Sequence, residues 1–520
     1  MQHFPKGRFL YTRRRIWSEL LMLSIGIDSG TQSTKVVVLD LESGQVIATA
    51  RRPVPMISGL PPGFMEQHPA DWVTAAEEAL LECLAALGER KGEVVAIGVS
   101  GQQHGLVVLN ERDEVIRPAK LWCDTSTASQ CAAFHAEFGG PKGMIELTGN
   151  PMLPGYTAPK LLWLKENEPA HFRKIRTVLL PHDYLNFWLT GEKKMEYGDA
   201  SGTGWMNVRM REWVPEILEF IDPAVVAAIP KVGSSRRPNG LLRSELLAAW
   251  GLKGPVVVSA GGGDNMMGAI GTGNLMPGCV TASLGTSGTL YSYASTPVVD
   301  PEGEVAAFCD STDAWLPLVC TMNVTVAIEQ VRNLFGWTYE QLDAEVARVP
   351  AGAEGLLFLP YLQGERTPNL PSGCGVFHGL NTRNMTPGCM ARAVLEGVTM
   401  GLAYGLERLR SLGVKPREVR LTGGGSASPV WRQLCADLFG VSTVCLTSPE
   451  GAALGAAIQA AATEGEVSGR LGTLRDLAAR VVTLDEATRC HPNPKTVETY
   501  KPLLAKMEGT TKKLHKTGLL

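Results

Sequence analysis

An apolar run, a short polar turn and a second apolar run occupy residues 24–39. This pattern predicts a strand, a tight turn and a second strand. Gly30 lets the backbone approach a ligand closely, and Thr31 and Gln32 add small donors. Asp28 stands at the lip of the turn, where a carboxylate can hold Mg²⁺ through water. The turn therefore fits a phosphate-and-metal site, although an ordinary polar hairpin would show the same pattern. It is not a Walker A loop, because no Gly-Lys-Ser/Thr opens a helix here.

The chain is too long for a single core. Its 520 residues predict about three domains, and large α/β enzymes often settle on two. The net charge is −3, from 49 basic and 52 acidic side chains, and no block of like charge stands out. We therefore expect neither a nucleic acid nor a membrane surface as partner. We also expect no transmembrane helix, because no run of 18 apolar residues exists.

The cysteines and the first residues bear on location. None of the eleven cysteines stands in a Cys-x-x-Cys pair or a cluster with zinc spacing, which is typical of a reducing compartment, and we expect a cytoplasmic protein. Residues 1–21 are rich in arginine and poor in acids. They are either an organelle transit peptide or a disordered extension from an upstream start codon, with Met22 as the natural start.

The pattern of strands and helices starts twice. A helix over 71–87 and a buried strand over 94–99 follow the first hairpin, and a second buried strand begins at Pro255. A second glycine–hydroxyl turn between strands contains Gly285 and Thr286. We therefore predict two similar α/β domains that face each other across a cleft, over 22–254 and 255–505. The basic segment 506–520 is expected to be a frayed tail.

Asp264 is the best candidate for a general base. It follows three glycines, residues 261–263, at the end of a buried strand, where α/β sheets bind their ligands. The alternative is that Asp264 only caps a helix that starts at Met266. These two roles are compatible.

Other groups point to a polyol and a nucleotide. Gln103 and His104 lie in a glycine-flanked turn and can both donate and accept hydrogen bonds, as a polyol requires. The alternative is a turn histidine without a ligand. The triple glycine 423–425 can pass beneath an adenine or ribose, or form a mere tight turn. Glu365 and Arg366 are expected to form a buried or interfacial ion pair with a structural role.

The chain resembles the FGGY family of carbohydrate kinases, which has the actin/Hsp70/hexokinase type of ATPase fold. The first family signature matches throughout residues 155–167. The second resembles residues 375–396 and departs at Cys389, which falls on a helix start. Within the family, five segments resemble bacterial xylulose-phosphorylating members: 101–105, 180–185, 261–265, 283–288 and 359–368.

The resemblance implies two ribonuclease H-like domains and ATP-dependent phosphorylation of D-xylulose with Mg²⁺. It implies that Asp264 takes the proton from the sugar hydroxyl and that Asp28 positions Mg²⁺. The remaining implied contacts are with sugar (Gln103, His104, Asp264 and Asn265), with phosphates (Thr31, Gln32 and Thr286) and with the nucleoside (Gly424 and Ser428). Ser428 stands where relatives often carry Asn.

Alternatives remain at this point. The substrate can be another small polyol, such as L-fuculose, ribulose or glycerol. The Gln-Gln-His-Gly turn argues against glycerol, because the family's glycerol kinases carry an Arg-Glu pair there. A different class is a non-catalytic sugar-sensing protein or an actin-like filament former, against which the intact Asp28 and Asp264 argue. A homodimer is left open.

Overall fold

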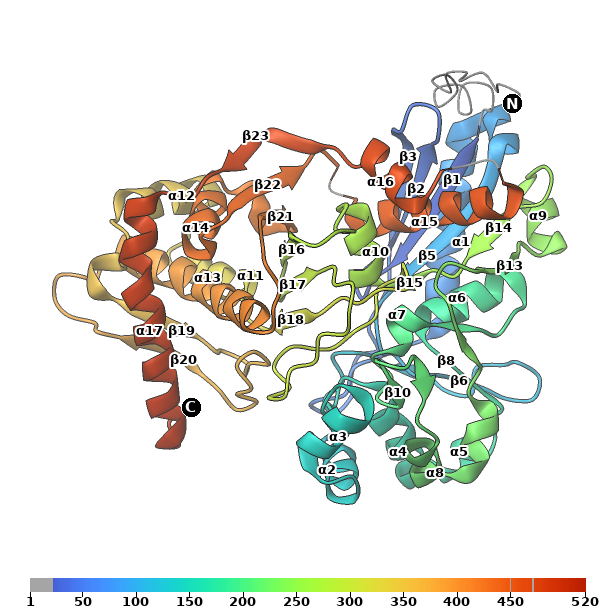
Figure 1. Ribbon diagram of the computed structural model, residues 1–520, viewed down its shortest axis with the longest axis horizontal. Coiled ribbons are helices and arrows are strands. Elements are labelled where there is room, and N and C mark those ends of the chain that lie inside the picture. The colour runs from blue at the N-terminus through green and yellow to red at the C-terminus, as the bar shows by residue number, and fades with distance from the viewer. Residues whose placement is uncertain (1–21, 449, 470–471) are drawn as a thin grey trace, which may run out of the picture.

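The computed structural model describes residues 22–448, 450–469 and 472–520. The interpretations of residues 1–21 lie outside this part. The described residues form two lobes, each built on a mixed sheet (Figure 1). The first sheet contains β1 (Leu23–Ser29), β2 (Ser33–Asp40), β3 (Val46–Pro53), β5 (Val94–Gly101), β13 (Pro238–Leu241), β14 (Val257–Ser259) and β15 (Gly262–Gly263). The second contains β16 (Cys279–Leu284), β17 (Gly288–Ser292), β18 (Leu318–Thr321), β21 (Glu418–Thr422), β22 (Ser442–Leu446) and β23 (Leu484–Cys490).

The two sheets share one topology. The first runs in the order β3-β2-β1-β5-β14-β13, and the second in the order β18-β17-β16-β21-β22-β23. In each order the third, fourth and fifth strands are parallel, and the flanking strands are antiparallel to their neighbours. The hairpins β1–β2 and β16–β17 therefore occupy equivalent places. The predicted recurrence of the glycine–hydroxyl turn reflects a structural repeat.

Helices and short strand pairs cover these sheets. The helices are α1 (Pro69–Leu87), α2 (Ala128–Glu137), α3 (Gly140–Thr148), α4 (Thr157–Asn167), α5 (Pro169–Phe172), α6 (Pro181–Thr190), α7 (Tyr197–Ala200), α8 (Pro215–Ile221), α9 (Ser244–Trp250), α10 (Asp264–Gly271), α11 (Thr325–Leu334), α12 (Tyr339–Arg348), α13 (Pro387–Ser411), α14 (Pro429–Phe439), α15 (Gly451–Ser468), α16 (Leu474–Val481) and α17 (Pro494–Lys516). The short strands are β4 (Glu66–Gln67), β6 (Val107–Leu109), β7 (Ala119–Lys120), β8 (Thr177–Leu179), β9 (Met195–Glu196), β10 (Met206–Asn207), β11 (Glu212–Trp213), β12 (Val232–Gly233), β19 (Leu357–Pro360) and β20 (Gly375–His378). Among the described helices, none is long and apolar enough to cross a membrane.

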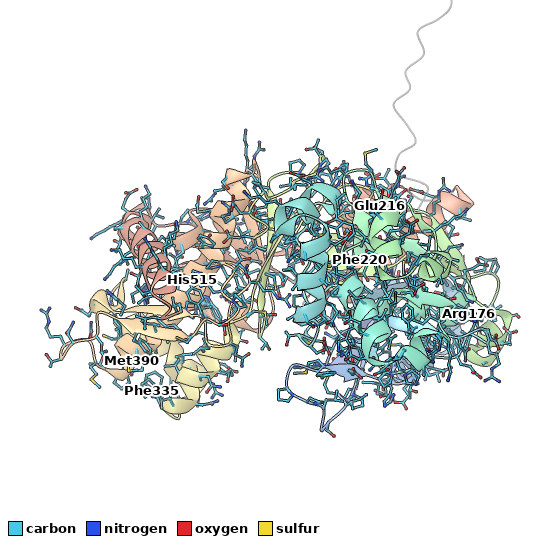
Figure 2. All side chains as sticks on the ribbon, turned by 90° about the horizontal axis from the view of Figure 1, so that it is seen from below. Arg176, Glu216, Phe220, Phe335, Met390 and His515 are labelled. Atoms are coloured by element: carbon cyan, nitrogen blue, oxygen red, sulfur yellow. The ribbon has the colours of Figure 1, made fainter. Side chains whose placement is uncertain are left out.

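Two expectations about the limits of the lobes need correction. The strand expected to open the second domain at Pro255 contains β14, which pairs with β5 in the first sheet. The first sheet therefore continues past residue 255. Residues 506–520 do not form the expected frayed tail, because α17 continues through most of them and buries Met507. Figure 1 shows α17 along the outer side of the second lobe. Figure 2 shows Phe335 and Met390 on that lobe, and Phe220 and Arg176 on the other.

Helices α10 and α15 join the lobes. The small-residue segment 451–457, predicted to permit close packing, lies in α15. A Cβ on Gly455 would lie 1.8 Å from the carbonyl oxygen of Met267 in α10, and one on Gly26 of β1 would lie 1.9 Å from that of Ala453. Since real Cβ atoms do not approach backbone atoms so closely, glycine is required at both positions.

We expect Gly455→Ala to lower the free energy of unfolding by about 1–3 kcal/mol or more, because the added methyl group forces the two helix backbones apart. Thermal unfolding followed by circular dichroism measures this. The matched control is Gly509→Ala in α17, where a Cβ would meet nothing within 4 Å. That variant should gain roughly 0.5–1 kcal/mol from helix propensity. Equal melting temperatures for the two variants would contradict the close-packing argument.

Candidate active site

The register of the first sheet brings the predicted groups to one edge. Asp28 of β1 lies opposite Ser100 of β5 in parallel pairing, and Ser100 lies opposite Gly262 of β15. All three strands therefore end together. The turn with His104 follows β5, and Asp264 follows β15. The carboxyl ends of parallel strands are where such sheets bind ligands.

A pocket of about 410 Å³ opens beside this edge. It contains all four residues predicted to contact sugar: Gln103, His104, Asp264 and Asn265. The second half of the chain contributes further polar groups to its wall: Ser283, Ser287, Thr289, Glu304, Glu365 and Arg366. The predicted phosphate, nucleoside and metal residues are not in this wall. Some of them adjoin it, because Ser287 of the wall follows Thr286 and Trp122 of the wall donates a hydrogen bond to the Thr31 hydroxyl at 2.9 Å.

Asp264 is a partly buried carboxylate at the start of α10. Its Oδ1 accepts hydrogen bonds from the backbone amide and the Nδ2 of Asn265, at 2.8 and 2.9 Å. Helix α10 begins at Asp264 with Gly263 as N-cap, so Asp264 is not the cap of a helix that starts at Met266. Desolvation, with the charges of Asp28 and Asp199, raises the pKa of Asp264 to about 7. A carboxyl with such a pKa is matched to proton transfer near neutral pH.

Gln103, in the turn after β5, and Asn265, in the first turn of α10, form one polar unit. The Nδ2 of Asn265 donates to the Oε1 of Gln103 at 2.8 Å. The Nε2 of Gln103 is buried and has no hydrogen-bond partner among the described residues. A buried donor without a partner is costly. The unpaired Nε2 of Gln103 therefore favours a ligand that places an acceptor oxygen in this pocket.

His104 is held in place by residues of the first family signature. Its backbone has a φ of 61°, which is strained for a side chain of this type. The Nζ of Lys160 and the Oγ1 of Thr157 donate to its carbonyl oxygen at 2.7 and 3.2 Å. Its ring packs against Tyr156 and Phe308 at centroid distances of 5.2 and 5.4 Å. Burial lowers the pKa of His104 well below its usual value, with help from nearby cations, so the ring is neutral.

Asp199 and His182 lie behind His104 and were not predicted from the sequence. The Nδ1 of His182 lies 2.8 Å from the Oδ2 of Asp199, and the Oδ1 of Asp199 lies 3.8 Å from the Nδ1 of His104. All three side chains are buried. No local signal marks Asp199, because it comes from α7, whose position behind the pocket depends on the whole lobe.

Asp28 is the predicted metal residue. Its Oδ1 accepts a hydrogen bond from the Ser100 hydroxyl at 2.8 Å, and burial raises its pKa. Lys35 pairs with Glu450 at 2.5 Å rather than with Asp28. The described residues contain no group of three or more His, Cys, Asp or Glu arranged to hold a metal ion. A single carboxylate fits Mg²⁺, which keeps most of its water and takes its other ligands from phosphates.

The two turns predicted to bind phosphate differ in whether their threonine hydroxyl already has a hydrogen-bond partner among the described residues. The Oγ1 of Thr31 donates to the Oε1 of Gln102 at 3.1 Å and accepts from the Nε1 of Trp122 at 2.9 Å. The Thr31 hydroxyl therefore has internal partners, and Gln32 beside it is exposed. Thr286 is also exposed, and its carbonyl accepts the amide of Val324 at 3.1 Å. In both turns, the residue at the tip of the hairpin is therefore accessible from outside: Gln32 between β1 and β2, and Thr286 between β16 and β17.

The predicted nucleoside residues lie at the matching edge of the second sheet. A Cβ on Gly423 would lie 2.7 Å from the backbone of Leu284, so the triple glycine packs directly against the β16–β17 turn. A Cβ on Gly424 would meet nothing within 4 Å, which leaves open space there. Ser428 is the N-cap of α14, and its hydroxyl donates to Asp343 at 2.7 Å. The only donor of the Ser428 side chain is thus already used.

Family models match both halves of this chain. The model of the FGGY family of carbohydrate kinases, N-terminal domain, matches residues 23–271, and that of the C-terminal domain matches residues 280–464. The chain belongs to this family. Its departure from the second family signature is structurally mild, because Cys389 lies in the first turn of α13 and its amide is still capped by the Thr386 hydroxyl at 3.3 Å.

The FGGY chain is similar to proteins named for xylulose. It is 42% identical to the xylulose kinase of Haemophilus influenzae over 486 residues, which cover 92% of this chain and 97% of the relative. It is 39% identical to the xylulose kinase of Escherichia coli over 83% of this chain and 88% of that one. Its fold matches the xylulose kinase structure from Brucella ovis with a TM-score of 0.88 and 32% identity, covering 95% and 100% of the two chains.

Structural similarity alone does not separate substrates within this family. The gluconate kinase structure from Lactobacillus acidophilus also matches with a TM-score of 0.88, at 26% identity, covering 95% of this chain and 98% of that one. The choice of sugar must therefore be made by the side chains of the pocket.

Proposed function

We propose that this FGGY kinase transfers the γ-phosphoryl group of ATP to the 5-hydroxyl of D-xylulose. The observation that carries the proposal is that the Gln103–Asn265 unit, His104 and Asp264 line one and the same pocket. The similarity to xylulose kinases over nine-tenths of the chain supports this choice of sugar. The eleven cysteines, all unpaired, support the further proposal of a reducing, cytoplasmic location.

In this proposal Asp264 accepts the proton of the attacking hydroxyl. Phosphoryl transfer requires positioning and charge neutralisation more than covalent chemistry from the protein. A carboxylate suffices as base because the loose transition state releases the proton late. The polar unit of Gln103 and Asn265, with neutral His104, orients the sugar. Enclosure between the lobes excludes water, which would otherwise accept the phosphoryl group.

ATP is proposed to lie between the two hairpin turns. The turn at Thr31 and Gln32 and the equivalent turn at Thr286 are proposed to contact phosphates. Gly424 is proposed to leave open space for the nucleoside. The Ser428 hydroxyl already donates its hydrogen bond to Asp343, so its side chain can contact the nucleoside only as an acceptor or after that bond breaks. Asp28 is the residue that would hold Mg²⁺, which neutralises phosphate charge when bound.

The proposal is tested by a coupled assay of ADP release over D-xylulose, D-ribulose, L-fuculose, gluconate and glycerol. We expect D-xylulose to have the highest kcat/KM. Each polar group that a wrong sugar leaves unpaired costs about 1–3 kcal/mol in a closed pocket. Glycerol should be poor because it fills too little of the pocket. Highest activity on another sugar would refute the xylulose assignment, and no sugar-dependent ADP release would refute the kinase assignment.

His104→Ala should reduce kcat/KM for D-xylulose and weaken its preference over D-ribulose, because a polar contact and the packing of Tyr156 are lost together. The KM for ATP should stay near that of the parent, since His104 lies in the sugar pocket. The matched control is His135→Ala, which removes a partly buried imidazole outside the pocket wall. A loss confined to ATP affinity would contradict the placement of His104 at the sugar.

A further inference from the structure

Arg366 brings a cation from the second lobe to the sugar pocket. It lies in the loop between β19 and β20 and belongs to the pocket wall. Its guanidinium carbon lies 5.5 Å from the ring centroid of Trp122, a residue of the first lobe. Its Nη2 lies 3.5 Å from the place that a Cβ on Gly155 would take. The absence of a side chain at Gly155 thus leaves room for the guanidinium.

The expected ion pair between Glu365 and Arg366 is not formed. The Oε1 of Glu365 instead accepts the backbone amides of Met322 and Arg366, at 2.7 and 2.8 Å. Its Oε2 accepts the Nδ2 of Asn323 at 3.3 Å. These bonds satisfy the carboxyl locally, and burial raises its pKa to about 7. Glu365 therefore shapes the loop and does not provide the counter-charge for the guanidinium of its neighbour.

The other carboxyls of the pocket wall are also engaged elsewhere. Glu304 accepts from the Tyr404 hydroxyl at 2.8 Å and pairs with Arg408 at 3.0 Å. Asp264 is bonded to Asn265. Among the described residues, Arg366 makes no ion pair, and its guanidinium makes only a weak hydrogen bond of 3.9 Å to the Sγ of Cys320. In the part of the chain that the structure describes, the guanidinium of this wall residue therefore has no oxygen acceptor from the protein.

We propose that Arg366 is a specificity-determining residue that donates a pair of hydrogen bonds to two neighbouring oxygens of the ketose, the C2 carbonyl and the C3 hydroxyl. The planar fork of a guanidinium matches two adjacent acceptors, which a single ammonium does not. The inference rests on the proposed function, because it places the reacting 5-hydroxyl at Asp264 and the ketone end at Arg366. Because Arg366 and Gln103 come from opposite lobes, the sugar bridges them.

The test compares Arg366→Gln, Arg366→Lys and the parent with D-xylulose and D-ribulose, which differ only in configuration at C3. We expect the KM for D-xylulose to rise about 10- to 100-fold in Arg366→Gln, the range for hydrogen bonds from a charged donor, with a smaller change in kcat. The preference for D-xylulose should fall towards one. Arg366→Lys should recover part of the KM but not the preference. Calorimetric titration with D-xylulose in the absence of ATP should show the same loss of affinity.

Arg211→Gln is the matched control. The Arg211 guanidinium also stacks on a tryptophan, 4.1 Å from the ring centroid of Trp315, but it lies outside the pocket wall. Unchanged KM and preference in Arg366→Gln, or an equal loss in Arg211→Gln, would overturn the proposal. If Arg366→Gln fails to fold, Arg366→Lys keeps the charge over Trp122, and a retained preference in that variant overturns it. If the parent favours another ketose, the function proposal fails, and the variants are measured with that sugar and its C3 epimer.

Discussion

Asp264→Asn should lower kcat by about 10²- to 10⁴-fold, the usual contribution of a positioned general base. The amide keeps the shape of the side chain and its contact with Asn265 but cannot accept the proton. ATP binding should persist, because Asp264 lies in the sugar pocket. The measurement combines steady-state kinetics on D-xylulose with calorimetric titration of ATP.

The matched control for Asp264→Asn is Asp437→Asn in α14. The Oδ1 of Asp437 accepts the Nε2 of Gln433 and the backbone amide of Asn493, at 2.9 and 2.8 Å, and an asparagine oxygen can keep both bonds. This variant should retain normal turnover. Near-normal turnover in Asp264→Asn would refute the assignment of the base.

The pH dependence gives a second readout on Asp264. The pKa of Asp264 is raised to about 7, so the carboxyl is largely protonated below that pH and cannot accept a proton. We therefore expect kcat/KM of the parent to fall as pH decreases through about 7. The same raised pKa means that the charged carboxylate costs folding stability above pH 7. Asp264→Asn should accordingly melt at a higher temperature than the parent at pH 8.

Asp28→Asn should lower activity about 10- to 100-fold at limiting Mg²⁺, the usual effect of removing an outer-sphere partner of a metal. Activity should recover in part as Mg²⁺ is raised, since the lost charge weakens metal binding rather than the sugar site. The charge of Asp28 also helps to raise the pKa of Asp264. The acidic limb of the residual activity should therefore move to lower pH.

The control for Asp28→Asn is Asp40→Asn, at the other end of the same hairpin. Asp40 accepts the backbone amides of Glu42 and Ser43 at 2.9 and 3.1 Å and pairs with Arg90 at 3.0 Å, far along β2 from the turn. Its Mg²⁺ titration should match that of the parent. If the titration of Asp28→Asn matches the parent as well, Asp28 has no part in metal binding.

Local sequence patterns were enough to predict the elements on which the site is built. The hairpin with Asp28 and the strand that leads to Asp264 follow from apolar runs that end in glycine, because the side-chain period and the freedom of glycine act over a few residues. The resemblance to the family then predicted Gln103, His104 and Asn265 as one group. The structure places these three side chains and Asp264 in one pocket.

Only the tertiary structure decided what depends on contacts between distant segments. An apolar run does not specify its partner, so the strand at 257–259 was expected in the second sheet and pairs in the first. The burial of α17 follows from its packing on the second lobe. The adjacent residues Glu365 and Arg366 were expected to pair. In the structure the Glu365 carboxyl accepts backbone amides instead, and Arg366 lies in the pocket wall. Since each outcome depends on groups far away in the chain, no local pattern could have predicted it.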